Sequence, residues 1–129
     1  MRILLDTNRL TDALRRERCV AALVEEAAEI CVPFIALAEI KAGFLGGDPR
    51  RRAHNESLLL RFLRLRSVEV LYADRETTEV YARLLLQLRQ AGTPIPTNDL
   101  WIASLAIQHE LALITRDAHF AKVPQVALL

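Results

Sequence analysis

Several residue types are scarce in this sequence of 129 residues, and each scarcity excludes a class of protein. Aromatic residues make up 5% of the chain, too few for the stacking platform of a dedicated single-strand nucleic-acid binder. The two cysteines, Cys19 and Cys31, form no CxxC pair and have no neighbouring histidine, so a zinc site is not indicated. We expect both to be inert core thiols in a reducing compartment.

Net charge is also nearly absent, because seventeen Lys and Arg oppose sixteen Asp and Glu to give +1. Attraction by the whole molecule therefore cannot explain binding to a polyanion, and any nucleic-acid contact must be local. No apolar run approaches membrane-spanning length, and the N-terminus lacks the features of a signal peptide. These absences predict a cytoplasmic protein without membrane contact.

Hydrophobic residues are abundant, at 52%, and charged residues make up 26%. A chain of this size and composition is expected to form one domain, residues 1–129, with a substantial core and some apolar surface left for a partner. Short apolar runs alternate with longer helical patterns, which favours a parallel sheet covered by helices on both faces. We predict a three-layer α/β/α domain whose strands lie near residues 3–5, 30–32, 68–71, 112–114 and 126–128.

Two helices have recognisable ends. Asp74 is placed to cap a helix that runs to Gln90, and Thr97 or Asn98 is placed to cap another that reaches Glu110. A further helix around residues 58–65 is apolar over most of its circumference and needs cover on more than one side. The sequence leaves open whether that cover comes from the core or from a second subunit or partner.

Four acidic residues occupy unusual positions. Asp6 and Asp117 follow predicted strands, and ligands of parallel sheets collect at the carboxyl ends of strands. Glu39 and Asp99 lie on predicted helices whose neighbouring positions are apolar, so Glu39 is expected to project into protein or into a cleft. Taken singly, each acid except Glu39 has a structural explanation, such as a turn or a favourable contact with a helix dipole.

Together, these carboxylates would repel one another unless some were protonated or bound a cation. Oxygen ligands without cysteine or histidine indicate Mg²⁺ or Mn²⁺ rather than zinc. Such a cation activates water and stabilises charge on a phosphodiester, so hydrolysis of a nucleic-acid strand is the expected reaction. Acidic metal sites also serve phosphatases and phosphoacceptor domains, and the acids alone do not separate these classes.

Four segments resemble, in order and position, the motifs of PIN-domain nucleases, and the likeness is greatest to the VapC toxins of prokaryotic toxin-antitoxin pairs. It spans nearly the whole chain, from Asp6 to Phe120. The segments are Leu4-Leu5-Asp6-Thr7-Asn8, residues 33–39, Asn98-Asp99-Leu100-Trp101-Ile102-Ala103 and Thr115-Arg116-Asp117-Ala118-His119-Phe120.

The resemblance implies a PIN-like domain with a parallel five-stranded sheet, one or two Mg²⁺ or Mn²⁺ ions, and endonucleolytic cleavage of RNA in a prokaryotic cytoplasm. It also implies a homodimer and a small cognate antitoxin protein. Carried onto this sequence, it makes Asp6 and Asp99 the main metal ligands, with Glu39 and Asp117 completing the catalytic set through metal or water. Asn8 and Thr115 become supporting hydrogen-bonding groups, and Arg116 is a candidate for contact with RNA.

Two residues depart from the family pattern, and three histidines have no place in it. Arg9 stands where a small or apolar residue is common, and Trp101 where a smaller or aliphatic one is common; neither disturbs the acids. His54, His109 and His119 are too scattered for a ligand set, and we interpret all three as structural.

The main alternative is a phosphoacceptor signalling domain that binds Mg²⁺. It fits poorly, because paired acids are expected after the first strand, where Asp6-Thr7-Asn8 offers one, and Leu71-Tyr72-Ala73 offers no acceptor at the third strand. A haloacid-dehalogenase-like phosphatase fits less well, since its motif requires Asp at position 8. A non-catalytic PIN-like binding module is a third alternative, against which the intact set of four acids argues.

Overall fold

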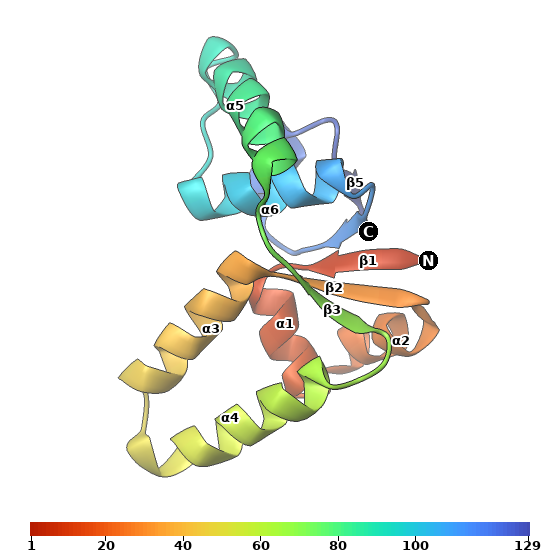
Figure 1. The fold of residues 1–129 in the computed structure, drawn as a ribbon, viewed down its shortest axis with the longest axis vertical. Coiled ribbons are helices and arrows are strands. Elements are labelled where there is room, and N and C mark those ends of the chain that lie inside the picture. Colours follow the sequence, from red (N-terminus) through yellow and green to blue (C-terminus); the bar gives the residue numbers. More distant parts are fainter.

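The computed structural model describes residues 1–129 and consists of a parallel sheet with helices on both faces (Figure 1). The strands are β1 (Arg2–Leu5), β2 (Glu29–Pro33), β3 (Val68–Leu71), β4 (Ala112–Ile114) and β5 (Ala127–Leu128). The helices are α1 (Thr7–Leu14), α2 (Arg18–Glu26), α3 (Phe34–Gly46), α4 (Pro49–Leu63), α5 (Arg75–Gln90) and α6 (Thr97–Gln108), followed by the 3-10 helix η1 (Ala118–Lys122).

The strand order is β3-β2-β1-β4-β5, and every neighbouring pair is parallel. This confirms the predicted five-stranded parallel sheet. The strand order reverses at β1, which pairs with β2 on one side and with β4 on the other. Because the strands are parallel, their carboxyl ends lie along one edge of the sheet, and the residues after β1 and β4 are neighbours there.

Alternation of side chains along the strands builds two cores, one on each face of the sheet. Ile3 and Leu5 face a core shared with α1 to α4, whereas Leu4 faces a second core shared with α5, α6 and η1. All three strand residues are fully buried. Figure 1 shows the resulting layers, with α5 and α6 on one side of the sheet and α1 to α4 on the other.

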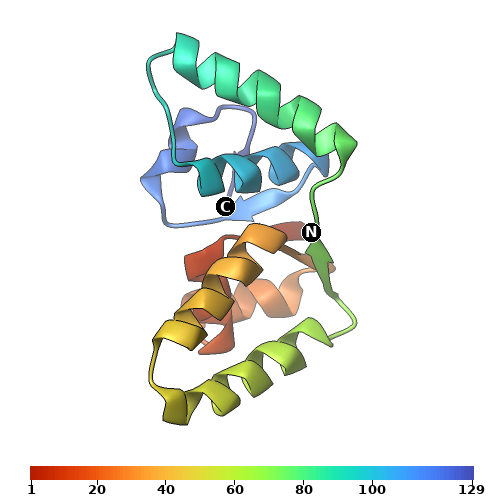
Figure 2. The ribbon, with the colours of Figure 1, turned by 60° about the vertical axis from the view of Figure 1, so that its left-hand side comes forward.

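Helices α3 and α4 form a hairpin that extends away from the sheet (Figure 2). Asp48 caps α4 by accepting a hydrogen bond from the backbone N–H of Arg50, and Pro49 fits its first turn. The apolar stretch at residues 58–65 is only partly covered by the chain itself: Leu59 and Phe62 are buried, while Leu60 and Leu65 are about half exposed. One face of this helix is therefore left without cover from the chain itself.

The predicted ends of two helices are partly right. Asp74 caps α5, which ends at Gln90 as expected. Neither Thr97 nor Asn98 caps α6, because Pro96 occupies the cap position, and the helix ends at Gln108.

The prediction that both cysteines are buried in the core is right for Cys31 and wrong for Cys19. Cys19 is the second residue of α2 and is exposed. None of the helices combines the length and apolar composition needed to cross a membrane.

Candidate active site

The site begins at the reversal point of the sheet, where the chain leaves β1 and β4. Asp6 directly follows β1, and its backbone N–H donates to the carbonyl oxygen of Ile114, the last residue of β4, at 3.3 Å. Thr115 follows Ile114, and its hydroxyl donates a hydrogen bond to Oδ2 of Asp6. The backbone N–H of Asp117 donates to the same hydroxyl oxygen at 3.0 Å. The Thr115 hydroxyl therefore links Asp6 and Asp117.

Asp6 is both the N-cap of α1 and a buried acid, only 4% exposed. Its Oδ1 accepts a hydrogen bond from the backbone N–H of Arg9 at 2.8 Å. Burial raises the pKa of Asp6 above its ordinary value, although the hydrogen bonds from Thr115 and Arg9 act in the opposite direction. The negative charge of Asp117 adds to the increase in this pKa. An ionised Asp6 is thus unfavourable here without further positive charge.

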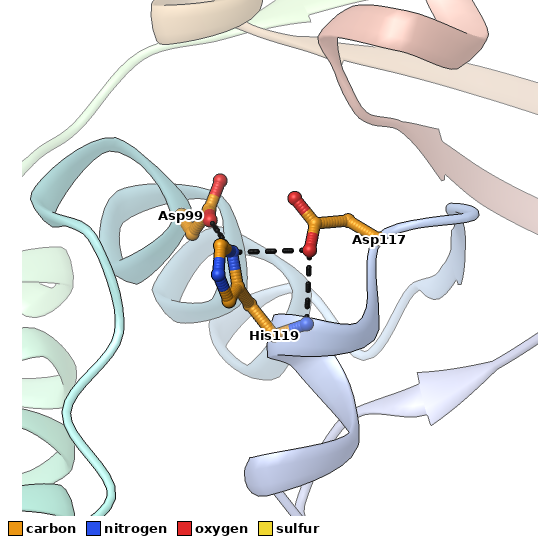
Figure 3. A group of neighbouring side chains, drawn as sticks. All are labelled: Asp99, Asp117 and His119. Carbon is orange, nitrogen blue, oxygen red and sulfur yellow. Dashed lines mark hydrogen bonds and ion pairs between the residues drawn. The ribbon is translucent and has the colours of Figure 1, made fainter.

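Asp99 and Asp117 both lie next to the imidazole of His119 (Figure 3). Asp99 projects from the first turn of α6, while Asp117 caps η1 by accepting from the backbone N–H of His119 at 2.9 Å. The Nδ1 atom of His119 lies 2.8 Å from Oδ2 of Asp99 and 3.0 Å from Oδ1 of Asp117. His119, which we interpreted from sequence as structural, therefore lies in contact with two of the predicted acids.

The neighbouring acids affect the pKa of Asp99. Burial raises the pKa of Asp99, and the hydrogen bond from His119 lowers it. The negative charges of Asp117 and Glu39 also raise this pKa. Each of the four predicted acids is therefore close to at least one other, since Asp117 also raises the pKa of Asp6.

Glu39 reaches the group from α3, and its Oε1 accepts a hydrogen bond from the hydroxyl of Thr7 at 2.9 Å. Its side chain is exposed rather than buried in protein, and it borders a cavity of about 520 Å³ between α1, α3 and α4. The cleft that the sequence suggested for Glu39 is thus present. Cationic side chains, Arg15 and Arg51, line the same cavity.

The donor atoms present fit a divalent cation. One ligand atom from each of Asp99, Asp117 and His119 lies within 4.8 Å of the others, a spacing that one ion can bridge. Asp6 adds a buried carboxylate whose ionised form burial disfavours, which is a reason for a cation to bind beside it. Carboxylate oxygens suit Mg²⁺ or Mn²⁺, and an imidazole nitrogen is better tolerated by Mn²⁺ than by Mg²⁺.

The three predicted supporting residues occupy different places. Thr115 is at the centre of the hydrogen bonds between Asp6 and Asp117. Asn8 is exposed on α1 and takes no part in those hydrogen bonds. Arg116 points to Asp12, a buried acid that the sequence did not single out, with its Nη2 atom 3.3 Å from Oδ1. A signal for Asp12 was available, because it lies three residues after Arg9 on one helix.

Comparison with known families supplies the remaining observation, since a family model described as PIN domain matches residues 3–126. The chain belongs to the PIN-domain family. Among curated PIN-domain relatives, ribonuclease VapC4 of Mycobacterium tuberculosis is 32% identical over 102 residues, covering 76% of this chain and 74% of that protein. Toxin FitB of Neisseria gonorrhoeae is 34% identical over 122 residues, covering 89% of this chain and 87% of that protein.

Solved structures with the same PIN fold include VapBC2 from Rickettsia felis, which was crystallised with a DNA fragment from its promoter. It superimposes with a TM-score of 0.88 at 29% identity, covering all of this chain and 98% of the matched one. The similarity extends over the whole α/β arrangement. It confirms the fold that the four PIN-like motifs implied.

Proposed function

We propose that this PIN-domain protein is a metal-dependent endoribonuclease and the toxin of a type II toxin-antitoxin system. The observation that carries the proposal is the convergence of four carboxylates, from four separate elements or loops, at the carboxyl edge of a parallel sheet. The relatives named ribonuclease VapC and toxin FitB, which share this fold and about a third of the sequence, support the same activity.

In this proposal Asp99 and Asp117 are both metal ligands, and Asp6 contributes a third carboxylate from the adjacent strand end. Their positions are fixed by backbone: Asp6 caps α1, Asp117 caps η1, and Asp99 occupies the first turn of α6. Glu39, steadied by Thr7, faces the site from the cavity side, where it can accept a proton or orient water. Bound Mg²⁺ or Mn²⁺ would activate water and stabilise the charge that develops on the phosphodiester.

The test is cleavage of a labelled oligoribonucleotide library by the purified chain. Cleavage should disappear in EDTA, return with Mg²⁺ or Mn²⁺, and be lost in Asp6→Asn and Asp99→Asn. Glu25→Gln, which changes an exposed acid on α2, is the matched control and should cleave like the wild type. Cleavage that persists in EDTA, or that survives in Asp99→Asn, would contradict the proposal.

We further propose two protein partners, a small antitoxin and a second copy of this chain. Several similar structures are toxin-antitoxin complexes, which supports the first partner. Exposed large apolar side chains, among them Leu45, Leu86 and Tyr72, are consistent with a homodimer. An adjacent reading frame whose product abolishes cleavage, with a basic side chain in the acidic site, is the expected result for the antitoxin. Sedimentation equilibrium tests for the dimer.

A further inference from the structure

Asp12, a buried acid outside the group of four carboxylates, accepts hydrogen bonds from two arginines. Asp12, on α1, is 5% exposed. Its Oδ2 accepts from Nη1 of Arg9 and its Oδ1 from Nη2 of Arg116, both at 3.3 Å. Burial of an ionised carboxylate is unfavourable unless the charge is paired, and here two guanidinium groups pair with it.

The two arginines differ in exposure. The side chain of Arg9 is 19% exposed, and its Nη1 also lies 3.3 Å from Sγ of Cys19. Its Nε atom is buried without a hydrogen-bond partner. The side chain of Arg116, by contrast, is 56% exposed. Arg9 is therefore held within the protein, while more than half of the Arg116 side chain is exposed to solvent.

Charge and position make Arg116 suitable for an anion. Two guanidinium groups and one carboxylate give this cluster a net positive charge. Of the two arginines, Arg116 is the more exposed. The only ion pair of Arg116 is with Asp12, so none of the four acids neutralises it. Its backbone lies between Thr115 and Asp117, which places the residue at the acidic site.

RNA that approaches four carboxylates meets repulsion, which a nearby cation would offset. We propose that Asp12 is a positioning residue that orients Arg116 to bind an RNA backbone phosphate beside the cleaved bond. One Nη atom is engaged by Asp12, and the remaining N–H donors of the planar fork can bind phosphate oxygens. This inference rests on the proposed ribonuclease function and assigns a role within it to a residue pair outside the acid group.

A purely structural tie between α1 and the loop after β4 is the competing explanation. It would change stability, and it would not selectively change affinity for RNA. The distinguishing measurement is therefore KM against kcat for cleavage of one labelled oligoribonucleotide in Mg²⁺, taken at several salt concentrations. The variants are Arg116→Ala, Arg116→Lys, Asp12→Asn, Asp12→Glu and the double variant of Asp12→Asn with Arg116→Ala.

Loss of a charge-assisted phosphate contact should raise KM for Arg116→Ala about tenfold, with kcat changed less than about twofold. The slope of log affinity against log salt should fall by about 0.7. Arg116→Lys should restore the salt slope but only part of the affinity, because it keeps the charge and loses the fork. Arg66→Ala is the matched control: this exposed arginine precedes β3, at the opposite edge of the sheet, and its loss should leave KM unchanged.

Asp12→Asn should also raise KM, and the double variant should be no worse than Arg116→Ala alone, because Asp12 acts through Arg116. Asp12→Glu should recover part of the loss. If Asp12→Asn fails to fold, the KM of Arg116→Ala still tests the proposal, because replacing an exposed side chain should leave the fold intact.

Wild-type cleavage with an unchanged KM in Arg116→Ala would overturn the inference, as would fully multiplicative effects in the double variant. Absence of metal-dependent wild-type cleavage would instead contradict the proposed function. The two failures are therefore distinguishable.

Discussion

One nitrogen atom of His119 is shared between two carboxylates: Nδ1 lies 2.8 Å from Oδ2 of Asp99 and 3.0 Å from Oδ1 of Asp117. The two acids come from α6 and from the loop before η1, so the imidazole joins segments that no strand pairing connects. A histidine in this position either helps to hold the metal or orients the acids that do.

His119→Ala should therefore lower the rate of RNA cleavage at limiting metal by about 10-fold to 100-fold, the usual effect of losing a group that supports a metal site. Cleavage is measured as a function of Mg²⁺ and Mn²⁺ concentration. His109→Ala is the matched control, since His109 lies at the far end of α6 and should leave metal dependence unchanged. Equal metal-dependence curves for His119→Ala and the wild type would contradict this role.

Metal should stabilise the folded protein through the same acids. Binding to the native state alone adds about 2.7 kcal/mol at a metal concentration 100 times the Kd, which raises Tm by several degrees. Asp99→Asn should lose most of this increase, whereas Glu25→Gln should retain it. Differential scanning fluorimetry with and without Mg²⁺ or Mn²⁺ measures the effect. An equal rise in Tm for both variants would place the bound metal elsewhere.

The metal-free protein should become less stable as pH rises through the range where Asp6 and Asp99 ionise. The pKa of each is raised above the ordinary value of 3.8, mainly by burial. A raised native pKa gives stability that is present below 3.8 and is lost as pH rises through the native pKa. Saturating metal should remove this loss. Denaturant unfolding at several pH values tests it, with Asp99→Asn expected to show a weaker dependence on pH.

The positions of the strands and of the acids that follow them were predictable because each depends on local pattern. The short apolar run Ile3-Leu4-Leu5 identifies β1, and an acid that follows such a strand must lie at the carboxyl edge of the sheet. Thr115 and Asp117 follow β4 and reach the same edge for the same reason. The α/β fold, and the placing of Asp6 and Asp117 at one edge of the sheet, therefore follow from sequence.

The sequence did not predict the surroundings of side chains whose environment depends on how elements pack. The approach of His119 to Asp99 requires the turn that Asp117 caps, which brings a residue two positions later back over the acid. Glu39 has apolar helical neighbours, yet it is exposed, because α3 and α4 diverge and leave a cavity beside it. Cys19 is apolar in character but lies on the outer side of α2. The hydrophobic periodicity of the sequence does not predict these contacts and exposures.

The two cysteines should differ strongly in reactivity. Cys31 is fully buried in β2, and burial, with the negative charge of Glu29 beside it, raises the pKa of its thiol to about 12. At pH 8 only about one molecule in ten thousand would carry this thiolate. Cys19 is exposed. A thiol-disulfide reagent at pH 8 should thus modify one thiol per native chain, none in Cys19→Ser, and two after denaturation. Rapid modification of native Cys19→Ser would show that Cys31 is accessible.

A buried hydroxyl couples α5 to α6, the helix that carries Asp99. Thr77 is fully buried; its hydroxyl donates to Oε1 of Gln108 at 2.5 Å and accepts from the backbone N–H of Asp74 at 3.0 Å. Thr77→Val keeps the shape and β-branching but leaves both partners without this hydroxyl, so the free energy of unfolding should fall by about 1–3 kcal/mol.

The neighbouring Thr78 offers a matched control, because it is exposed and its hydroxyl donates only to the backbone carbonyl of Arg75. Thr78→Val should change the free energy of unfolding by less than about 0.5 kcal/mol. Urea unfolding gives both values. RNA cleavage by Thr77→Val, measured well below its Tm, should stay close to that of the wild type, because the Thr77 hydroxyl lies beside Gln108 at the opposite end of α6 from Asp99. Equal stabilities of the two variants would mean that the Thr77 hydroxyl does not couple the helices.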